Sequence, residues 1–275
     1  MKIIIAEPSG FCFGVSRAVE LAEEHLKNNN LVSLGKIIHN DDEIKRLESL
    51  GMKTAEQLEE IESEVVLVRS HGESRSTLEK LGECREIVNA TCPFVTKLQR
   101  IVEETTELGC QVIILGSSEH PEIRGVMGWA KSDEVYAANS MEELKTLTLA
   151  DKKTVVCAQT TLNEVFWAEA TEYLTSLRDD IDFRNTICSA TKDRQRAAAE
   201  VSKEVDLMIV IGGRHSSNTR KLFEICKKHN NNTILIENSR ELMMKKMQNC
   251  GIIGISAGAS TPQWVIQEVV DALNQ

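Results

Sequence analysis

The sequence predicts an α/β fold in which mostly parallel sheets form three similar repeats. Short apolar runs alternate with amphipathic helical patterns along the 275 residues, and this alternation favours parallel sheets joined by crossover helices. Most of the apolar runs are nearly continuous, as expected for strands buried on both faces of a sheet. A cysteine also recurs at a nearly constant distance from a glycine, which indicates an internal repeat.

The individual elements follow from these patterns in chain order. We expect strands at residues 2–6, 65–70, 85–90, 111–116, 154–159, 207–212, 233–237 and 251–256. Two further strands should end at Gly35 and lead into Cys188. Helical patterns occupy residues 16–28, 94–108, 191–204, 218–230 and 263–273. The last of these follows Thr261 and Pro262, which are residue types favoured at a helix start.

The repeat is defined by three cysteines. Gly35 follows Cys12 by 23 residues, Gly116 follows Cys92 by 24, and Gly212 follows Cys188 by 24. Polar residues stand four and six positions after each glycine: His39 and Asp41, His120 and Glu122, Ser216 and Asn218. Unrelated α/β segments of similar size would share the spacing, but they would not each begin with a cysteine. We therefore predict three α/β domains around a pseudo-threefold axis, with boundaries at 13–92, 93–188 and 189–275, the last joined by the N-terminal strand 1–12.

Composition excludes several classes of function. The chain has 32 basic and 42 acidic residues and a net charge of −10, so nothing in its overall charge favours binding to nucleic acid or to an anionic membrane. No apolar run approaches the roughly 20 residues that a membrane span needs. The start, MKIIIAEPSG, is typical of a first strand and not of a signal peptide. We expect a cytoplasmic protein.

The cysteines indicate a metal centre. Eight cysteines without a secretion signal argue against disulfides, and we expect Cys84, Cys110, Cys157, Cys226 and Cys250 to pack in the core. The sequence contains no C-x2-C or C-x3-C pair, so it does not resemble a closed zinc site, although a catalytic zinc with three protein ligands would also fit. Three thiolates suit an iron–sulfur cluster better. A [4Fe-4S] cluster held by three cysteines keeps one iron without a protein ligand, and that iron could bind a substrate oxygen and pass electrons to it.

Polar residues at the strand ends suggest a small anionic ligand. They are His39, His71, His120, Thr160, Ser216, Ser217, Asn218 and Ser260. Two groups of hydroxyl residues precede helices, and helix N-termini bind phosphate without Lys or Arg; plain capping explains one such group, but two favour a phosphate or diphosphate. His25 and His229 fall in helical patterns and are expected to be structural.

Glu122 is an acid in a loop of otherwise neutral donors, and beside a cluster and an anion its pKa should rise, which suits a general acid. The sequence contains no G-x-G-x-x-G or Walker A motif. Electrons would therefore have to come from a partner protein.

Nine ordered blocks carry a resemblance to a known family. They are SGFCFGVSRAVE, GKIIHN, RSHGES, NATCPFVTK, SSEHPEIRGVMG, AQTTL, NTICSATKDRQ, GGRHSSNTRKL and SAGASTP, from about residue 9 to 262. These blocks resemble the 4-hydroxy-3-methylbut-2-enyl diphosphate reductase (LytB/IspH) family. The resemblance implies an iron–sulfur oxidoreductase of isoprene biosynthesis that performs the last step of the methylerythritol phosphate pathway. The implied reaction is a two-electron, two-proton dehydroxylation giving isopentenyl and dimethylallyl diphosphates.

The resemblance also implies roles for single residues. Cys12, Cys92 and Cys188 would hold one [4Fe-4S] cluster per chain, at the centre of a trefoil of three domains. Glu122 would supply protons through Thr160, with His120 in the same path. His39, His71, His120, Thr160, Ser216, Ser217, Asn218 and Ser260 would bind the diphosphate. Reduced ferredoxin or flavodoxin would be the electron donor.

Two residues depart from the family pattern, and two other functions stay open. His215 stands where Asn is expected, and Phe13 stands where a small residue is usual. One alternative is another three-cysteine [4Fe-4S] enzyme similar to quinolinate synthase, which condenses and dehydrates without net redox change; the HPE acid and the QTT pair argue against it. The other is a binding protein in which the three cysteines hold a structural metal.

Overall fold

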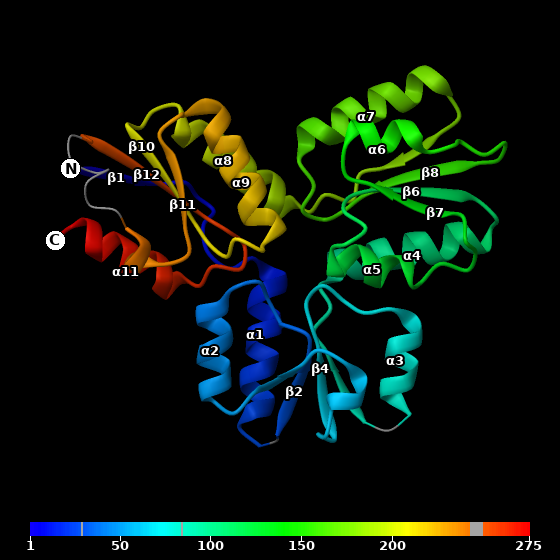
Figure 1. Ribbon diagram of the computed structural model, residues 1–275, viewed down its shortest axis with the longest axis horizontal. Helices are drawn as coiled ribbons and strands as arrows, with labels where there is room; N and C mark the ends of the chain where they lie inside the picture. Colours follow the sequence, from blue (N-terminus) through cyan, green and yellow to red (C-terminus); the bar gives the residue numbers. More distant parts are fainter. Residues whose placement is uncertain (29, 84, 243–249) are drawn as a thin grey trace. The chain divides into compact units, whose positions relative to one another are not determined.

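The computed structural model describes residues 1–28, 30–83, 85–242 and 250–275 (Figure 1). Its strands form three four-stranded sheets, and every strand pair within them is parallel. The predicted α/β class with parallel sheets is confirmed. The described chain divides into two compact units: unit 1 comprises Met1–Ser16, Ile38–Ser49 and Ser189–Gln275, and unit 2 comprises Arg17–Ile37 and Leu50–Cys188. The three predicted domain boundaries stay a prediction.

Unit 1 contains one sheet with helices on both faces. The strand order is β1 (Lys2–Ile5), β12 (Ile252–Ala257), β10 (Leu207–Ile211), β11 (Thr233–Ile236). The helices are α2 (Asp41–Ser49), α8 (Ser189–Ser202), α9 (Ser217–His229) and α11 (Gln263–Leu273). Alternate side chains of a strand point to opposite faces, so Ile209 packs in the cluster that contains α11, while Met208 packs against α8 and α9. Figure 1 shows α11 on one side of this sheet and α8 and α9 on the other.

Unit 2 contains the other two sheets. Their strand orders are β3 (Lys53–Ala55), β2 (Leu31–Leu34), β4 (Val65–Val68), β5 (Glu86–Asn89), and β7 (Val135–Ala138), β6 (Gln111–Leu115), β8 (Thr154–Ala158), β9 (Asp182–Arg184). The helices are α3 (Arg75–Gly82), α4 (Pro93–Glu107), α5 (Pro121–Met127), α6 (Met141–Thr146) and α7 (Glu164–Leu177), and α1 (Phe13–Leu26) begins in unit 1 and continues here. Ile113 packs in the cluster containing α6 and α7, whereas Ile114 packs in the cluster containing α4 and α5 (Figure 1).

All the expected strands and helices are present, but two strands were missed, and the helices α2, α3, α5, α6 and α7 were not among those expected. Both β3 and β7 lie at a sheet edge, and each is short and partly exposed. Such a strand needs no continuous apolar run, because only one side of it is paired and its outer residues face water. These segments therefore gave no strand pattern in the sequence.

Most of the cysteines expected to pack do so. Cys110, Cys157 and Cys226 are buried and Cys250 is partly buried, while Cys84 lies outside the described residues. Burial raises the pKa of Cys157 to about 12 and that of Cys226 to about 11, because a thiolate is poorly solvated in the core. These two thiols are therefore protonated and structural at neutral pH.

Candidate active site

The three repeat cysteines occupy equivalent places in the backbone. Each stands directly before the first residue of a helix: Cys12 before α1, Cys92 before α4 and Cys188 before α8. None of the three forms a disulfide among the described residues, and each is partly exposed. A helix N-terminus favours negative charge through its unsatisfied N–H groups. Each position therefore suits a thiolate ligand better than the buried cysteines do.

One main-chain hydrogen bond fixes each of these cysteines to its sheet. The cysteine N–H donates to a carbonyl two residues beyond the end of the neighbouring strand, β12, β4 or β8. The bonds are Cys12 to Ala259 at 3.1 Å, Cys92 to Ser70 at 3.0 Å and Cys188 to Thr160 at 3.1 Å. The repeat that the sequence spacing predicted is thus also present in the hydrogen bonding.

Glu122 is a buried acid in unit 2, held by Thr160. The Thr160 N–H donates to Oε1 of Glu122 at 2.8 Å, and the Thr160 hydroxyl donates to Oε2 at 2.7 Å. Glu122 is only 2% exposed, and burial raises its pKa despite the two bonds from Thr160, which lower it. The expected increase is therefore found, and its cause is desolvation. Glu122 lies in the first turn of α5 and not in a loop, because Pro121 begins the helix there.

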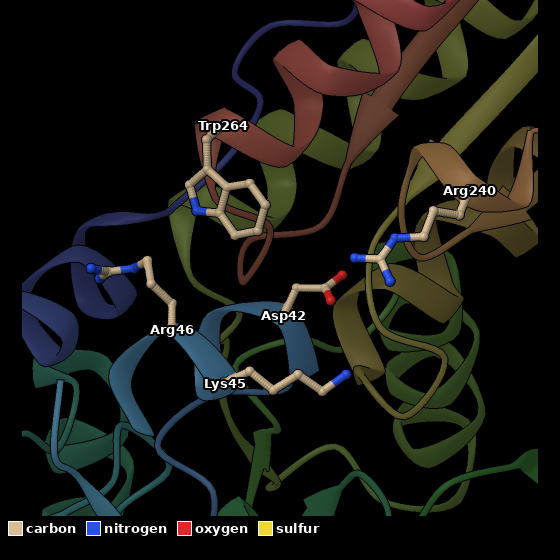
Figure 2. Close-up of a pocket in the computed structure, with 5 residues that line it drawn as sticks. All are labelled: Asp42, Lys45, Arg46, Arg240 and Trp264. Carbon is tan, nitrogen blue, oxygen red and sulfur yellow. The ribbon is translucent and has the colours of Figure 1, made fainter. Parts of the chain in front are cut away.

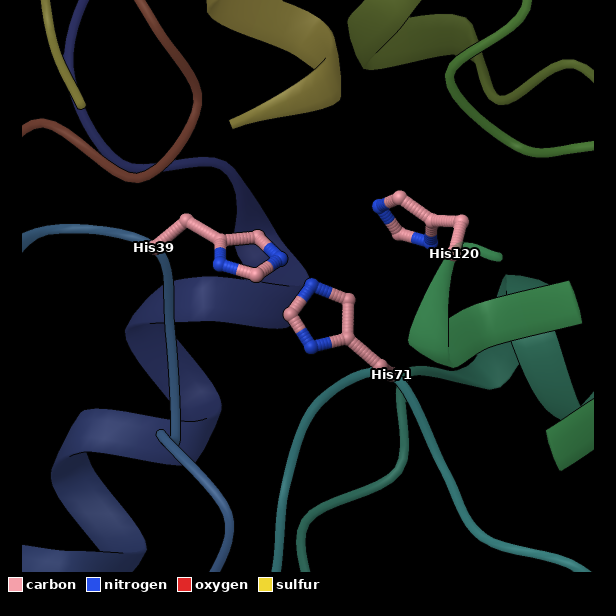
Figure 3. Close-up of side chains that lie close together, drawn as sticks. All are labelled: His39, His71 and His120. Atoms are coloured by element: carbon pink, nitrogen blue, oxygen red, sulfur yellow. The ribbon is translucent and has the colours of Figure 1, made fainter. Parts of the chain in front are cut away.

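His120 is the residue that caps α5, and its ring lies against His71. Nδ1 of His120 accepts a hydrogen bond from the Glu122 N–H at 3.1 Å, so in the neutral ring the proton is on Nε2. The rings of His120 and His71 are 5.4 Å apart, edge to face (Figure 3). Together with Glu122 and Thr160, they form the polar cluster of unit 2.

The strand-end residues of unit 1 surround the start of α9. Ser216 is the N-cap of this helix, and its hydroxyl accepts from the Thr219 N–H at 3.3 Å. The Ser260 hydroxyl donates to the main-chain carbonyl of His39 at 3.1 Å. A side chain at Gly213 would come within 2.6 Å of the same carbonyl, so glycine permits the close approach of these loops. Ser217 and Asn218 form the first turn of α9.

Asn218 is the most informative residue of this group. Its side chain is 4% exposed overall, yet neither its amide oxygen nor its amide nitrogen has a hydrogen-bond partner among the described residues. The hydroxyl of Thr219, which is fully buried, also lacks one there. Buried polar groups are nearly always paired, so these atoms indicate a polar ligand. Sequence reasoning missed Thr219; the run of four side-chain donors in SSNT at a helix start was the signal.

The two residues that depart from the family pattern are both exposed. Phe13 is 67% exposed although it directly follows Cys12. His215 lies in a turn that is closed by the hydrogen bond from the Ser216 N–H to the Gly213 carbonyl at 3.0 Å. Neither residue alters the hydrogen bonds that hold Cys12 or Ser216.

A separate hollow lies on the surface of unit 1. It has a volume of about 430 Å³ and is lined by Asp42, Lys45, Arg46, Arg240 and Trp264 (Figure 2). The Trp264 indole donates to Glu43 at 3.1 Å, which holds the ring at the edge of the hollow. None of the sequence-predicted site residues lines it. Among the described residues, no helix has the length and apolar character needed to cross a membrane.

Comparison with known proteins identifies the family. The LytB protein family matches residues 3–274. The 4-hydroxy-3-methylbut-2-enyl diphosphate reductase of Caldanaerobacter subterraneus subsp. tengcongensis is 46% identical over 281 residues, covering 99% of this chain and 96% of that protein. The solved E-1-hydroxy-2-methyl-but-2-enyl-4-diphosphate reductase of Plasmodium falciparum is 29% identical with a TM-score of 0.95, covering 100% and 88%. A second solved structure, an (E)-4-hydroxy-3-methyl-but-2-enyl diphosphate reductase, is 38% identical with a TM-score of 0.71, covering 100% and 99%. The chain therefore belongs to the LytB protein family.

Proposed function

We propose that this protein is a 4-hydroxy-3-methylbut-2-enyl diphosphate reductase. The Caldanaerobacter relative, which this chain matches over 96% of its length, carries this name, and one solved relative is titled the terminal enzyme of the non-mevalonate pathway. In the reaction the allylic C–O bond breaks and two electrons and two protons enter. One proton leaves with the hydroxyl as water. The other adds to carbon, giving isopentenyl or dimethylallyl diphosphate according to the carbon that receives it.

We propose that Cys12, Cys92 and Cys188 hold one [4Fe-4S] cluster. Support comes from their equivalent backbone positions and their partly exposed thiols, and from the match of an all-thiolate donor set to iron–sulfur chemistry. When bound, such a cluster supplies electrons, and its fourth iron, which lacks a protein ligand, supplies a Lewis acid for the substrate hydroxyl.

We propose Glu122 as the proton donor. A buried carboxyl with a raised pKa retains a proton at higher pH than an exposed one. The Thr160 hydroxyl is 2.7 Å from Oε2 of Glu122, so it can pass a proton on to a substrate. His120, whose Nδ1 is occupied by the Glu122 N–H, presents Nε2–H as a donor in the same cluster.

We propose that uncharged hydrogen-bond donors and the N-terminus of a helix bind the diphosphate. In unit 1, Ser216, Ser217 and Asn218 begin α9, and Ser260 and His39 lie in adjoining loops. The Asn218 amide, which has no hydrogen-bond partner among the described residues, is the observation that favours an anion over plain capping. We also propose His71, His120 and Thr160 of unit 2 as substrate-binding residues.

Turnover with the allylic hydroxy diphosphate tests this function. Anaerobically purified protein and an artificial reductant should give both diphosphate products, and the protein should contain about four irons per chain. If the purified protein contains zinc and neither iron nor sulfide, the result would support the alternative of a non-catalytic binding protein with a structural metal. If iron-loaded protein forms neither diphosphate product, the proposed reductase activity is refuted. In the cell, we propose reduced ferredoxin or flavodoxin as electron donor.

A further inference from the structure

An arginine from α1 holds the loop that precedes Cys92. Arg17 donates from Nη1 to the Thr91 carbonyl at 3.3 Å and from Nη2 to the Asn89 carbonyl at 3.1 Å. The Thr91 carbonyl and the Cys92 N–H belong to one peptide group, and this N–H donates to the Ser70 carbonyl at 3.0 Å. The peptide before Cys92 is thus held at both ends, and the cation polarises the second bond.

A second arginine holds the loop that precedes Cys12. Arg194 of α8 donates from Nη2 to the Gly10 carbonyl at 2.8 Å and from Nη1 to the Ala190 carbonyl at 3.1 Å. Its side chain is almost fully buried, with the residue 3% exposed, so water competes little for these bonds. Gly10 has a φ of +81°. The arginine therefore fixes a turn in the left-handed region two residues before Cys12.

The two arginines share one arrangement. Arg17 lies five residues after Cys12, and Arg194 lies six residues after Cys188. Each therefore lies on a helix that directly follows one cysteine, and each donates to the loop before a different cysteine: Arg17 to two carbonyls, and Arg194 to the Gly10 carbonyl.

We infer that Arg17 and Arg194 are positioning residues for Cys92 and Cys12. A guanidinium is a planar fork that can bind two carbonyls at once, which a lysine ammonium on a flexible stem does less well. A guanidinium that binds the main chain also restrains the cysteine that follows in the chain. Removing one guanidinium should therefore make one cysteine more mobile and leave the others unchanged. The consequence for a metal cluster rests on the proposed function, whereas the hydrogen bonds themselves do not.

The test compares Arg17→Met and Arg194→Met with a matched control. Lys97 lies five residues after Cys92, as Arg17 does after Cys12. It is exposed, and its side chain makes no hydrogen bond or ion pair among the described residues, so Lys97→Met should change nothing. Amide hydrogen exchange is measured on the full chain as purified. We expect Arg17→Met to accelerate exchange about ten-fold in residues 90–96, and Arg194→Met to do so in residues 10–16, which corresponds to about 1.4 kcal/mol each.

Iron retention provides the second measurement. Arg17→Met and Arg194→Met should each lose iron to a chelator faster than wild type and show a changed electron paramagnetic resonance signal. Arg17→Lys and Arg194→Lys should retain iron better than the methionine variants do. Equal acceleration in both segments, or none, would overturn the assignment, as would iron loss as fast in Lys97→Met. If wild type holds no iron, the proposed function fails, while the exchange data still decide the role of the arginines.

Discussion

Replacement of Asn218 by leucine should move stability and ligand affinity in opposite directions. Asn218 is buried in the first turn of α9, and both polar atoms of its amide lack partners among the described residues. A buried polar group left unpaired costs about 1–3 kcal/mol. Leucine has a similar volume and no polar atoms. Without ligand, we therefore expect Asn218→Leu to be more stable by about 2 kcal/mol, a rise of about 4–8 °C in melting temperature.

The same substitution should weaken the binding of diphosphate. A hydrogen bond from the amide to a charged phosphate oxygen contributes about 1.5–3 kcal/mol, so the dissociation constant should rise about 10- to 100-fold. Thermal unfolding without ligand and titration calorimetry with inorganic diphosphate measure the two effects. Inorganic diphosphate is suitable because it carries the proposed anion and cannot be reduced.

Asn230, the C-cap residue of α9, offers a matched control. Its amide nitrogen donates to the Val205 carbonyl at 2.8 Å, and its amide oxygen accepts from the Asn232 N–H at 2.8 Å. Asn230→Leu should therefore destabilise the protein by about 1–3 kcal/mol and leave diphosphate affinity unchanged. The reasoning is refuted if Asn218→Leu is less stable than wild type and still binds diphosphate equally well.

Three further substitutions test the remaining residues. Glu122→Gln should lower turnover about 10²- to 10⁴-fold while diphosphate affinity and iron content stay normal; near-normal turnover would remove Glu122 from the proton path. Because burial raises the Glu122 pKa, the stability this group contributes is complete below the unfolded value of 4.5 and is lost as pH rises through the raised pKa. Urea unfolding should accordingly show the glutamine variant gaining on wild type above pH 4.5, and a constant difference would contradict this. Cys92→Ala should lose iron and activity together, and iron and sulfide analysis that finds a complete cluster would rule out the three-thiolate set. Ser216→Ala removes the N-cap of α9 and should cost about 1 kcal/mol, measured by urea unfolding; an unchanged midpoint would show that the cap bond is dispensable.

The sequence predicted every central strand, and it missed two of the six edge strands that the structure describes, β3 and β7. Strands such as β6 and β10 are fully buried, and all their residues except Gln111 are apolar, so they are recognisable from composition alone. Edge strands such as β7 need only partial burial. For the candidate site, the constant cysteine-to-glycine spacing predicted the equivalent positions of the three cysteines. The position of Glu122 in a helix and the role of Thr219 were not predicted, because they depend on the residues at which α5 and α9 begin. The contacts of Arg17 and Arg194 were not predictable, because a carbonyl acceptor is offered by every residue type.

The turns that precede the three cysteines explain why the sequence before Cys12 lacks the asparagine found before Cys92 and Cys188. Before Cys92, the side-chain oxygen of Asn89 accepts from the N–H two residues on, at 3.0 Å, and before Cys188 Asn185 does the same at 3.1 Å. Before Cys12, Glu7 takes this role toward the Ser9 N–H at 2.9 Å. The loop there is longer and includes the left-handed turn at Gly10, so a longer acid can replace asparagine. What the three cysteines share is therefore a main-chain position, set by the carbonyl that each N–H meets beyond the neighbouring strand. Side-chain identity around a cysteine can change as long as that bond is kept, and the distance to the next glycine is consequently a better guide to the repeat than the neighbouring residues.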